Sequence, residues 1–245
     1  MALQEEVELT GNWLFKRRSF LPLILFVCAT VVIFTSHPDG LPHFHVYFNA
    51  LCLLLSMTGL GIRCFTVGFT PKHTSGRNVK QQIADVVNTK GIYSIVRHPL
   101  YLGNYLMWLG PIIYVGNMWF IIVCSLLFWL YYERIMFAEE AFLRQKFNSK
   151  YLKWADHTPA FIPAFKQWKA ADMHFSLRNV MKREYSGLLN TALSFVYIDM
   201  IKNYALSGKI YVNSIWTILF IVCLVIFSIL RTLKKRTSLL NVAGR

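Results

Sequence analysis

The sequence predicts an all-α fold, a polytopic membrane helix bundle of about six spans, on three observations. Of its 245 residues, 55% are hydrophobic, the mean hydropathy is positive, and apolar runs alternate with polar turns. A soluble globule needs far more charge on its surface. About 20 apolar residues are needed for a helix to cross a bilayer, and the runs approach that length.

The six expected spans are joined by polar connections of very different length. The third and fourth are separated by Gly116-Asn117, so they form a tight helical hairpin whose polar ends face the same side. Beyond Tyr132 we expect the fourth helix to leave the bilayer and to continue as far as Thr158-Pro159. The spans cover about residues 19–36, 44–65, 100–115, 118–138, 186–205 and 210–230.

These connections divide the chain into three segments. Residues 1–65 contain a polar tail and spans one and two; residues 66–165 contain a polar loop, the hairpin and the emerging helix. Residues 166–245 contain a basic, aromatic interfacial segment and spans five and six. Apolar residues at helical spacing predict a short surface helix over residues 79–87.

The basic residues predict the orientation in the membrane. The net charge of +14 could suggest nucleic acid, but Lys and Arg lie between apolar runs and no nucleic-acid module is recognisable, so we expect no such partner. With both termini in the cytoplasm, 24 of the 26 Lys and Arg lie on that side, and Lys202 and Lys209 lie outside. We therefore expect an integral protein of the bacterial inner membrane or the endoplasmic reticulum, with a cytoplasmic cofactor pocket.

The five cysteines stand singly in or beside apolar runs, without a CxxC pair or metal-ligand spacing. We interpret them as small core residues and predict no metal site. Spans five and six could form a lateral wall or a dimer surface, so the oligomeric state is left open.

The most unusual stretch is 91–103, where ionisable and aromatic residues directly precede an apolar span. Arg97 and His98 stand before Pro99, which suits the first turn of a helix. Interfacial anchoring accounts for any one of these residues taken alone. It does not require these types in this order, so we expect chemistry at this junction.

A second cluster, Glu139-Glu140, lies just beyond the predicted cytoplasmic end of span four, near the same mouth. Two adjacent glutamates on an emerging helix could be solvated residues that pair with Arg144. Alternatively, a carboxylate at this position could hold an amino group or a cationic centre.

Together the two clusters resemble the isoprenylcysteine carboxyl methyltransferase family and its relatives among phospholipid methyltransferases. The resemblance covers about residues 45–165 and leaves out spans five and six. Asn148 stands where the family often has Gly, and His157 stands where some members carry Arg. The matching blocks are Gly91 to Gly103 with its Arg97-His98-Pro99-Leu100-Tyr101 core, Glu139 to Leu143, Phe147 to Tyr151, and Thr158 to Pro163.

The resemblance implies an S-adenosylmethionine-dependent methyltransferase in which Arg97, His98 and Glu140 are catalytic. Aromatic faces can stabilise a sulfonium, carboxylates can pair with the methionine amino group, and glycine permits close approach. The implied cofactor contacts are Tyr93, His98, Pro99, Tyr101, Gly103, Glu139, Glu140 and Pro159.

For the acceptor, the resemblance implies a membrane lipid or lipidated substrate held by Arg77, Arg97 and His157. The 72–78 loop has cations and hydroxyls suited to a phosphate, although ordinary head-group contact explains it equally well. We rank O-methylation of a phosphate first, as in lipid A phosphate methyltransferases, before an isoprenylcysteine carboxylate and phosphatidylethanolamine N-methylation. An ionised oxygen needs no general base, whereas an ammonium must first lose a proton.

Two other classes of protein remain open at the level of sequence. Steroid 5α-reductases share a similar Arg-His-Pro block, so an NADPH-dependent reductase is one alternative, although Glu139-Glu140 favours methyl transfer. A non-catalytic membrane scaffold is the other.

Overall fold

The computed structural model describes residues 2–18, 20, 23–35, 46–72, 74 and 82–245. Throughout these residues the regular elements are helical, and the one β contact is an isolated bridge between Gly91 and Lys169, so the all-α class is confirmed. The α-helices are α1 Leu3–Arg17, α2 Leu23–Thr35, α3 Val46–Phe69, α4 Pro99–Val115, α5 Met118–Phe147, α6 Ser149–Ala155, α7 Leu177–Ser207 and α8 Ser214–Arg236.

The bundle is a membrane helix bundle in which helices α3, α5 and α8 are long and apolar enough to cross a bilayer. Helix α2 is apolar but has 13 residues. Helix α4 has 17 residues, and α7 contains the charged run Lys182 to Glu184 in its second turn. A helix lies at each of the six predicted positions, while six complete crossings remain a prediction.

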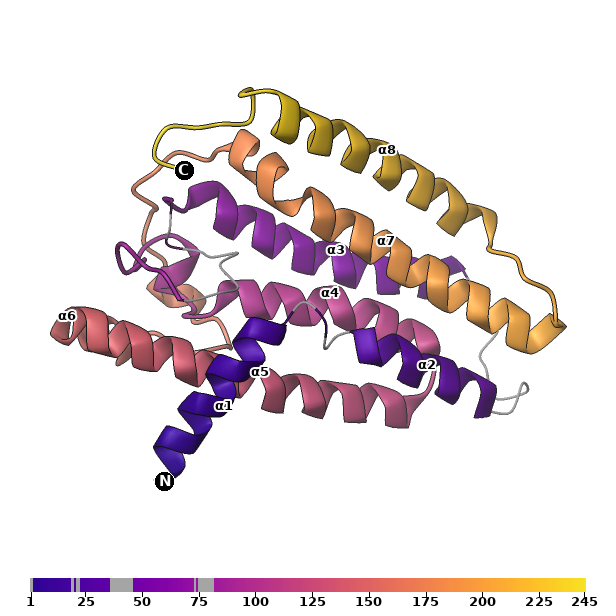
Figure 1. Cartoon of the computed structure of the whole chain (residues 1–245), viewed down its shortest axis with the longest axis horizontal. Coiled ribbons are helices and arrows are strands. Elements are labelled where there is room, and N and C mark those ends of the chain that lie inside the picture. Colours follow the sequence, from indigo (N-terminus) through magenta and orange to yellow (C-terminus); the bar gives the residue numbers. More distant parts are fainter. Residues whose placement is uncertain (1, 19, 21–22, 36–45, 73, 75–81) are drawn as a thin grey trace.

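The core of the bundle is the contact between α3 and α4, which run side by side (Figure 1). A Cβ atom built on Gly59 would lie 2.5 Å from the Gly103 carbonyl oxygen, and one on Gly110 would lie 2.1 Å from Ser56 Oγ. Glycine at these positions therefore lets the two backbones approach closely. Helix α7 packs against both α3 and α4, and α8 covers α7 (Figure 1).

The polar N-terminal segment forms a helix, which the sequence analysis missed. Helix α1 packs across α5, with Gly11 against the Arg134 carbonyl and Phe15 buried in a cluster of aromatic side chains. A Cβ atom on Gly11 would lie 2.1 Å from that oxygen, so the contact is close. The segment thus belongs to the folded domain.

The predicted surface helix over residues 79–87 is wrong for the part that the structure describes. Residues 82–90 contain bends but no helix, and residues 79–81 lie outside the described residues. Ala84 and Val87 are instead buried against the cavity described below. Burial of these side chains along a non-helical path outweighs the weak helix preference of a β-branched segment.

Both termini lie at the same end of the bundle as α6 (Figure 1). At the opposite end Asp199 and Lys202 are buried, whereas Lys202 was expected from the sequence only as a charge on the non-cytoplasmic side. Because helix α7 continues to Ser207, the side chains of Asp199 and Lys202 lie in the packed interior against α4 and α8.

Candidate active site

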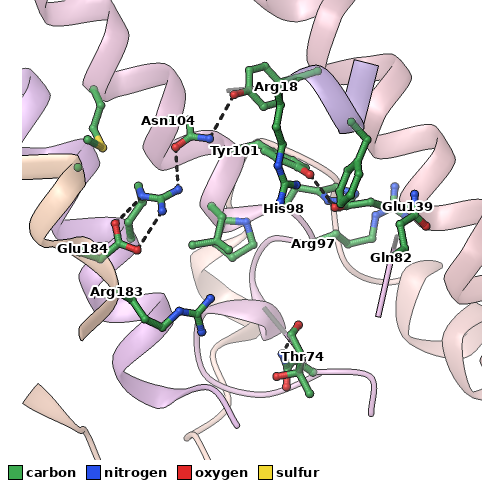
Figure 2. Close-up of a pocket in the computed structure, with 18 of the residues that line it drawn as sticks. Arg18, Thr74, Gln82, Arg97, His98, Tyr101, Asn104, Glu139, Arg183 and Glu184 are labelled. Carbon is green, nitrogen blue, oxygen red and sulfur yellow. Dashed lines mark hydrogen bonds and ion pairs between the residues drawn. The ribbon is translucent and has the colours of Figure 1, made fainter. Parts of the chain in front are cut away.

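A cavity of about 660 Å³ opens at the end of the bundle where the predicted clusters meet. This volume is within the range of small-molecule sites in proteins. Side chains from α1 to α7 and from the 82–101 segment line it, and Figure 2 shows its polar residues. The site is therefore built from all three sequence segments.

The loop before α4 is held in place by the segment that follows α6. Arg97 N donates to the Pro159 carbonyl at 2.9 Å, and His98 N donates to the Ala160 carbonyl at 3.1 Å. Gly91, with φ of +61°, is in the left-handed region that glycine tolerates. His98 is the N-cap of α4 and Pro99 its first residue, as the sequence predicted.

His98, Arg97 and Glu140 form one ionic group at the base of the cavity. His98 Nε2 lies 2.8 Å from Glu140 Oε1, and Arg97 Nε lies 3.1 Å from the same oxygen. Arg97 also donates from Nη1 to the Ala155 carbonyl at 3.1 Å. His98 and Arg97 line the cavity and Glu140 does not, so Glu140 lies behind them and fixes their orientation.

Glu139 faces the cavity and is linked to α4. It accepts a hydrogen bond from Tyr101 Oη at 2.7 Å, and its other oxygen lies 3.8 Å from His98 Nδ1. The Tyr101 ring stacks on His98 at 5.8 Å between centroids and contacts Tyr132 at 4.8 Å. A carboxylate bordered by aromatic rings can hold a cation that carries apolar groups.

Two further phenols complete this part of the cavity. Burial and the Glu139 carboxylate raise the pKa of Tyr93 above its ordinary value. Burial and the Glu140 carboxylate likewise raise the pKa of Tyr151. Both groups are therefore neutral hydrogen-bonding groups over the physiological pH range.

Six of the predicted site residues line the cavity, and among the described residues Gly103, Glu140, His157 and Pro159 do not. Gly103 lies at the contact with α3, where an added Cβ would be 2.6 Å from Arg63 Cγ, so its close approach is to a helix. Pro159 supports the loop through its carbonyl, His157 is exposed, and Arg77 lies outside the described residues. The lining residues are Tyr93, Arg97, His98, Pro99, Tyr101 and Glu139.

The sequence analysis missed a second polar group in the same cavity. Arg63 of α3 donates from Nε and Nη2 to the two Glu184 oxygens at 2.8 and 2.9 Å, and from Nη1 to Asn104 Oδ1 at 2.7 Å. Asn104 donates to Tyr132 Oη at 3.3 Å. A charge inside the apolar run of α3 was the available signal, because such charges face a bundle interior or a cavity.

The described residues contain no group of three or more His, Cys, Asp and Glu side chains that could hold a metal ion. The ionisable side chains that line the cavity are arginine, histidine, carboxylate and phenol groups.

Residues 43–150 match the sequence model of the family described as phospholipid methyltransferase. The cobalt-zinc-cadmium resistance protein CzcN of Cupriavidus metallidurans is 31% identical over 149 residues, which are 60% of this chain and 63% of that protein. No solved structure has significant similarity to the chain.

Two protein-S-isoprenylcysteine O-methyltransferases match a shorter part. The Schizosaccharomyces pombe protein is 35% identical over 75 residues, 31% of this chain and 32% of that protein. The Arabidopsis thaliana protein B is 35% identical over 77 residues, 31% of this chain and 38% of that protein. The chain thus covers less than two thirds of the length of each of these relatives.

Proposed function

We propose that this membrane protein transfers the methyl group of S-adenosylmethionine to an anionic lipid or lipidated acceptor. The premise is that residues 43–150 match the phospholipid methyltransferase family. One observation carries the proposal. The α4–α5 hairpin brings Glu139 back to His98 and Tyr101, so the two sequence clusters form one cavity wall.

The residues of this wall fit the methyl donor. The Glu139 carboxylate can pair with the donor's amino group, and the faces of Tyr101 and His98 can stabilise a sulfonium. Tyr93 offers a neutral phenol beside the same carboxylate. The aromatic rings around Glu139 limit the access of water, which strengthens each of these interactions.

The donor supplies an electrophilic methyl carbon bonded to a positive sulfur. The acceptor oxygen contributes the electron pair of the new O–C bond, and the electrons of the broken S–C bond stay on sulfur. The protein then has to align the methyl donor and the acceptor oxygen in a site without water. This contribution to catalysis comes from positioning rather than from acid–base chemistry. Arg97, fixed by Glu140, is placed to hold the acceptor oxygen.

The charges of the cavity favour an anionic acceptor. The lining includes four arginines, Arg18, Arg63, Arg97 and Arg183, against the two carboxylates Glu139 and Glu184. A donor with a sulfonium adds positive charge. We therefore favour O-methylation of a phosphate or a carboxylate over N-methylation of an ammonium, which would be repelled and would first have to lose a proton.

The position of the cavity supports the predicted topology. The cavity is lined by the 82–101 segment, which lies at the end of the bundle that carries both termini (Figure 1). We propose that this end faces the cytoplasm, where S-adenosylmethionine is available, in the inner membrane of a bacterium or in the endoplasmic reticulum.

Binding of S-adenosylhomocysteine to the purified full-length chain tests the proposal before any acceptor is known. We expect saturable binding that weakens about tenfold or more in Glu139→Gln, because a charged hydrogen-bonding partner is lost. Glu133→Gln changes an exposed glutamate of the same helix and should bind like the wild type.

Wild-type protein that shows no binding at millimolar S-adenosylhomocysteine would refute the assignment. Thermal stabilisation by NADPH in place of S-adenosylhomocysteine would favour the reductase alternative. Equal binding by the wild type and Glu139→Gln would remove Glu139 from the site.

A further inference from the structure

Helix α7 lies outside the matched segment 43–150, yet one of its faces forms a wall of the cavity. This wall extends from Arg183 to Ser194, about 16 Å along the helix axis. Its residues recur every three or four positions, and all but Gly187 and Leu193 are polar. They include Glu184, Asn190, Thr191 and Ser194.

The charged end of the wall is the Arg63–Glu184 ion pair, which is bidentate and largely buried, with side chains 17% and 5% exposed. A guanidinium has five N–H groups, and three are used by Glu184 and Asn104. Within the described part of the chain, this leaves one N–H on each terminal nitrogen beyond these contacts. Arg63 can thus donate a hydrogen bond to a further polar group while its bonds to Glu184 and Asn104 stay in place.

The rest of the wall offers hydrogen-bond acceptors. The Thr191 hydroxyl donates to the Gly187 carbonyl at 3.0 Å, and the Ser194 hydroxyl donates to the Asn190 carbonyl at 2.8 Å. Each hydroxyl oxygen keeps lone pairs that can accept from a bound molecule. Asn190 is exposed at the edge of the cavity and carries both donors and an acceptor.

The facing wall and the rim are apolar. Phe26 of α2 and Trp108 of α4 line the cavity with their rings 5.6 Å apart. Leu23 of α2 and Leu193 of α7 also line it and remain 55% and 47% exposed, so the apolar lining reaches the surface of the bundle between these helices. A bound molecule there has a polar and an apolar side.

The Glu139 side and the α7 side of the cavity are suited to different ligands. Figure 2 shows His98 between Glu139 on one side and Asn104 and Glu184 on the other. If Glu139 holds the donor, the α7 side is the space that an acceptor occupies. This step rests on the function proposed above.

We propose that α7, with the Arg63–Glu184 pair, is the acceptor-recognition element. It selects an amphiphile whose anionic oxygen is followed by hydroxyl or amide groups before the hydrocarbon begins. Such groups satisfy the hydroxyls, Asn190 and the remaining Arg63 donors, while the hydrocarbon leaves between Leu23 and Leu193. A molecule whose hydrocarbon starts at the anion would bury CH₂ groups against an ion pair and gain none of these hydrogen bonds.

The test compares three probes that bind the full-length chain saturated with S-adenosylhomocysteine in detergent, measured by native mass spectrometry. Lysophosphatidic acid has a phosphate followed by a hydroxyl before its acyl chain, an N-acetylated prenylcysteine has a carboxylate followed by an amide, and palmitate has a carboxylate directly on its hydrocarbon. We expect one of the first two to bind at least tenfold more tightly than palmitate, and which one it is identifies the anion.

The double variant Arg63→Met/Glu184→Met removes the pair without leaving an unpaired charge, so folding should be retained. In this variant the ratio of the palmitate dissociation constant to that of the preferred probe should fall below three. The dissociation constant of S-adenosylhomocysteine should be unchanged. The matched control Lys90→Met/Asp172→Met removes an exposed ion pair of 2.5 Å outside the cavity and should keep the preference.

Four results would each overturn the role of α7. Two concern the wild type: palmitate binds as tightly as the other probes, or no probe binds. The other two concern the variants: the preference survives in Arg63→Met/Glu184→Met, or it is lost in the control. The proposed function is judged separately, because it depends on S-adenosylhomocysteine binding by the wild type.

Discussion

Two polar clusters are buried at opposite ends of this bundle, and they differ in what surrounds them. At the end remote from the termini, Asp199 accepts hydrogen bonds from Tyr114 Oη at 2.7 Å, from Asn203 Nδ2 at 3.0 Å, and from the backbone and side-chain nitrogens of Asn213, each at 2.7 Å. Lys202 Nζ donates to the Tyr114 carbonyl at 2.9 Å. None of these residues lines the cavity.

At the other end Glu139 receives one short hydrogen bond, from Tyr101, and faces a cavity of about 660 Å³. A carboxylate whose acceptor sites are filled by the protein stabilises the fold, whereas one that faces a cavity can still bind a ligand. Burial of charge inside a membrane bundle is thus not by itself a sign of function.

The largest expected effect breaks the filled cluster. Asp199→Leu leaves the donors of Tyr114, Asn203 and Asn213 without their acceptor and removes the negative charge near the buried Lys202, so we expect a loss of about 3–5 kcal/mol of stability. Thermal unfolding in detergent measures it. Asp172→Leu, at an exposed position, should have little effect, and an Asp199→Leu protein as stable as the wild type would show that the cluster does not hold α4, α7 and α8 together.

The next effect concerns the open cluster. Glu140→Gln keeps the size of the side chain but removes the charge that orients His98 and Arg97. We expect kcat to fall about tenfold or more with an identified acceptor, while the dissociation constant of S-adenosylhomocysteine changes less than threefold. A change confined to the dissociation constant would instead make Glu140 a direct cofactor contact.

A smaller effect separates packing from binding at Gly103. Gly103→Ala places a methyl group 2.8 Å from the Gly59 carbonyl oxygen, so we expect destabilisation of about 1–3 kcal/mol with cofactor affinity retained in the folded protein. Gly61→Ala is the matched control in the same helix pair. Its Cβ would have no neighbour within 4 Å, and the lower backbone entropy of alanine should stabilise the protein by up to about 1 kcal/mol.

The smallest effect is a pH dependence to which the phenols do not contribute. Since the pKa values of Tyr93 and Tyr151 are raised, both phenols stay protonated in the folded protein above pH 9. Their contribution to stability is complete below the ordinary tyrosine pKa of about 10 and is lost at higher pH, where unfolded chains ionise first. Between pH 8 and pH 9.5 the affinity for S-adenosylhomocysteine should therefore change only through the ligand's own amino group, with the same pH profile in the wild type and in Tyr93→Phe. A titration in that interval which disappears in Tyr93→Phe would contradict this.

The sequence predicted those parts of the site whose residues lie close together in the chain. The 91–103 block and Glu139-Glu140 were expected to meet because a two-residue turn joins the helices between them, and the structure brings His98 and Glu140 within hydrogen-bonding distance. The helical class and the helix positions followed from apolar runs, since a membrane helix satisfies its backbone within one segment.

Contacts between distant segments were not predictable in the same way. Arg63 and Glu184 are separated by 121 positions, and neither position alone identifies its partner. The helix of residues 3–17 lacks a strong apolar stripe, and Lys202 was counted only as a charge on the outer side although it is buried. In each case tertiary packing, rather than local pattern, decided the outcome.

The backbone bonds from Arg97 and His98 to residues 159 and 160, and from Gly91 to Lys169, set an order for assembly. The α4–α5 hairpin can enter the membrane as soon as it has been synthesised, but the loop before α4 has no support until residue 169 has left the ribosome. Helix α7 follows only then, so its wall is added to a half of the pocket, around Glu139 and His98, whose supporting contacts are already available. Biogenesis thus completes the Glu139 half of the pocket before the α7 half.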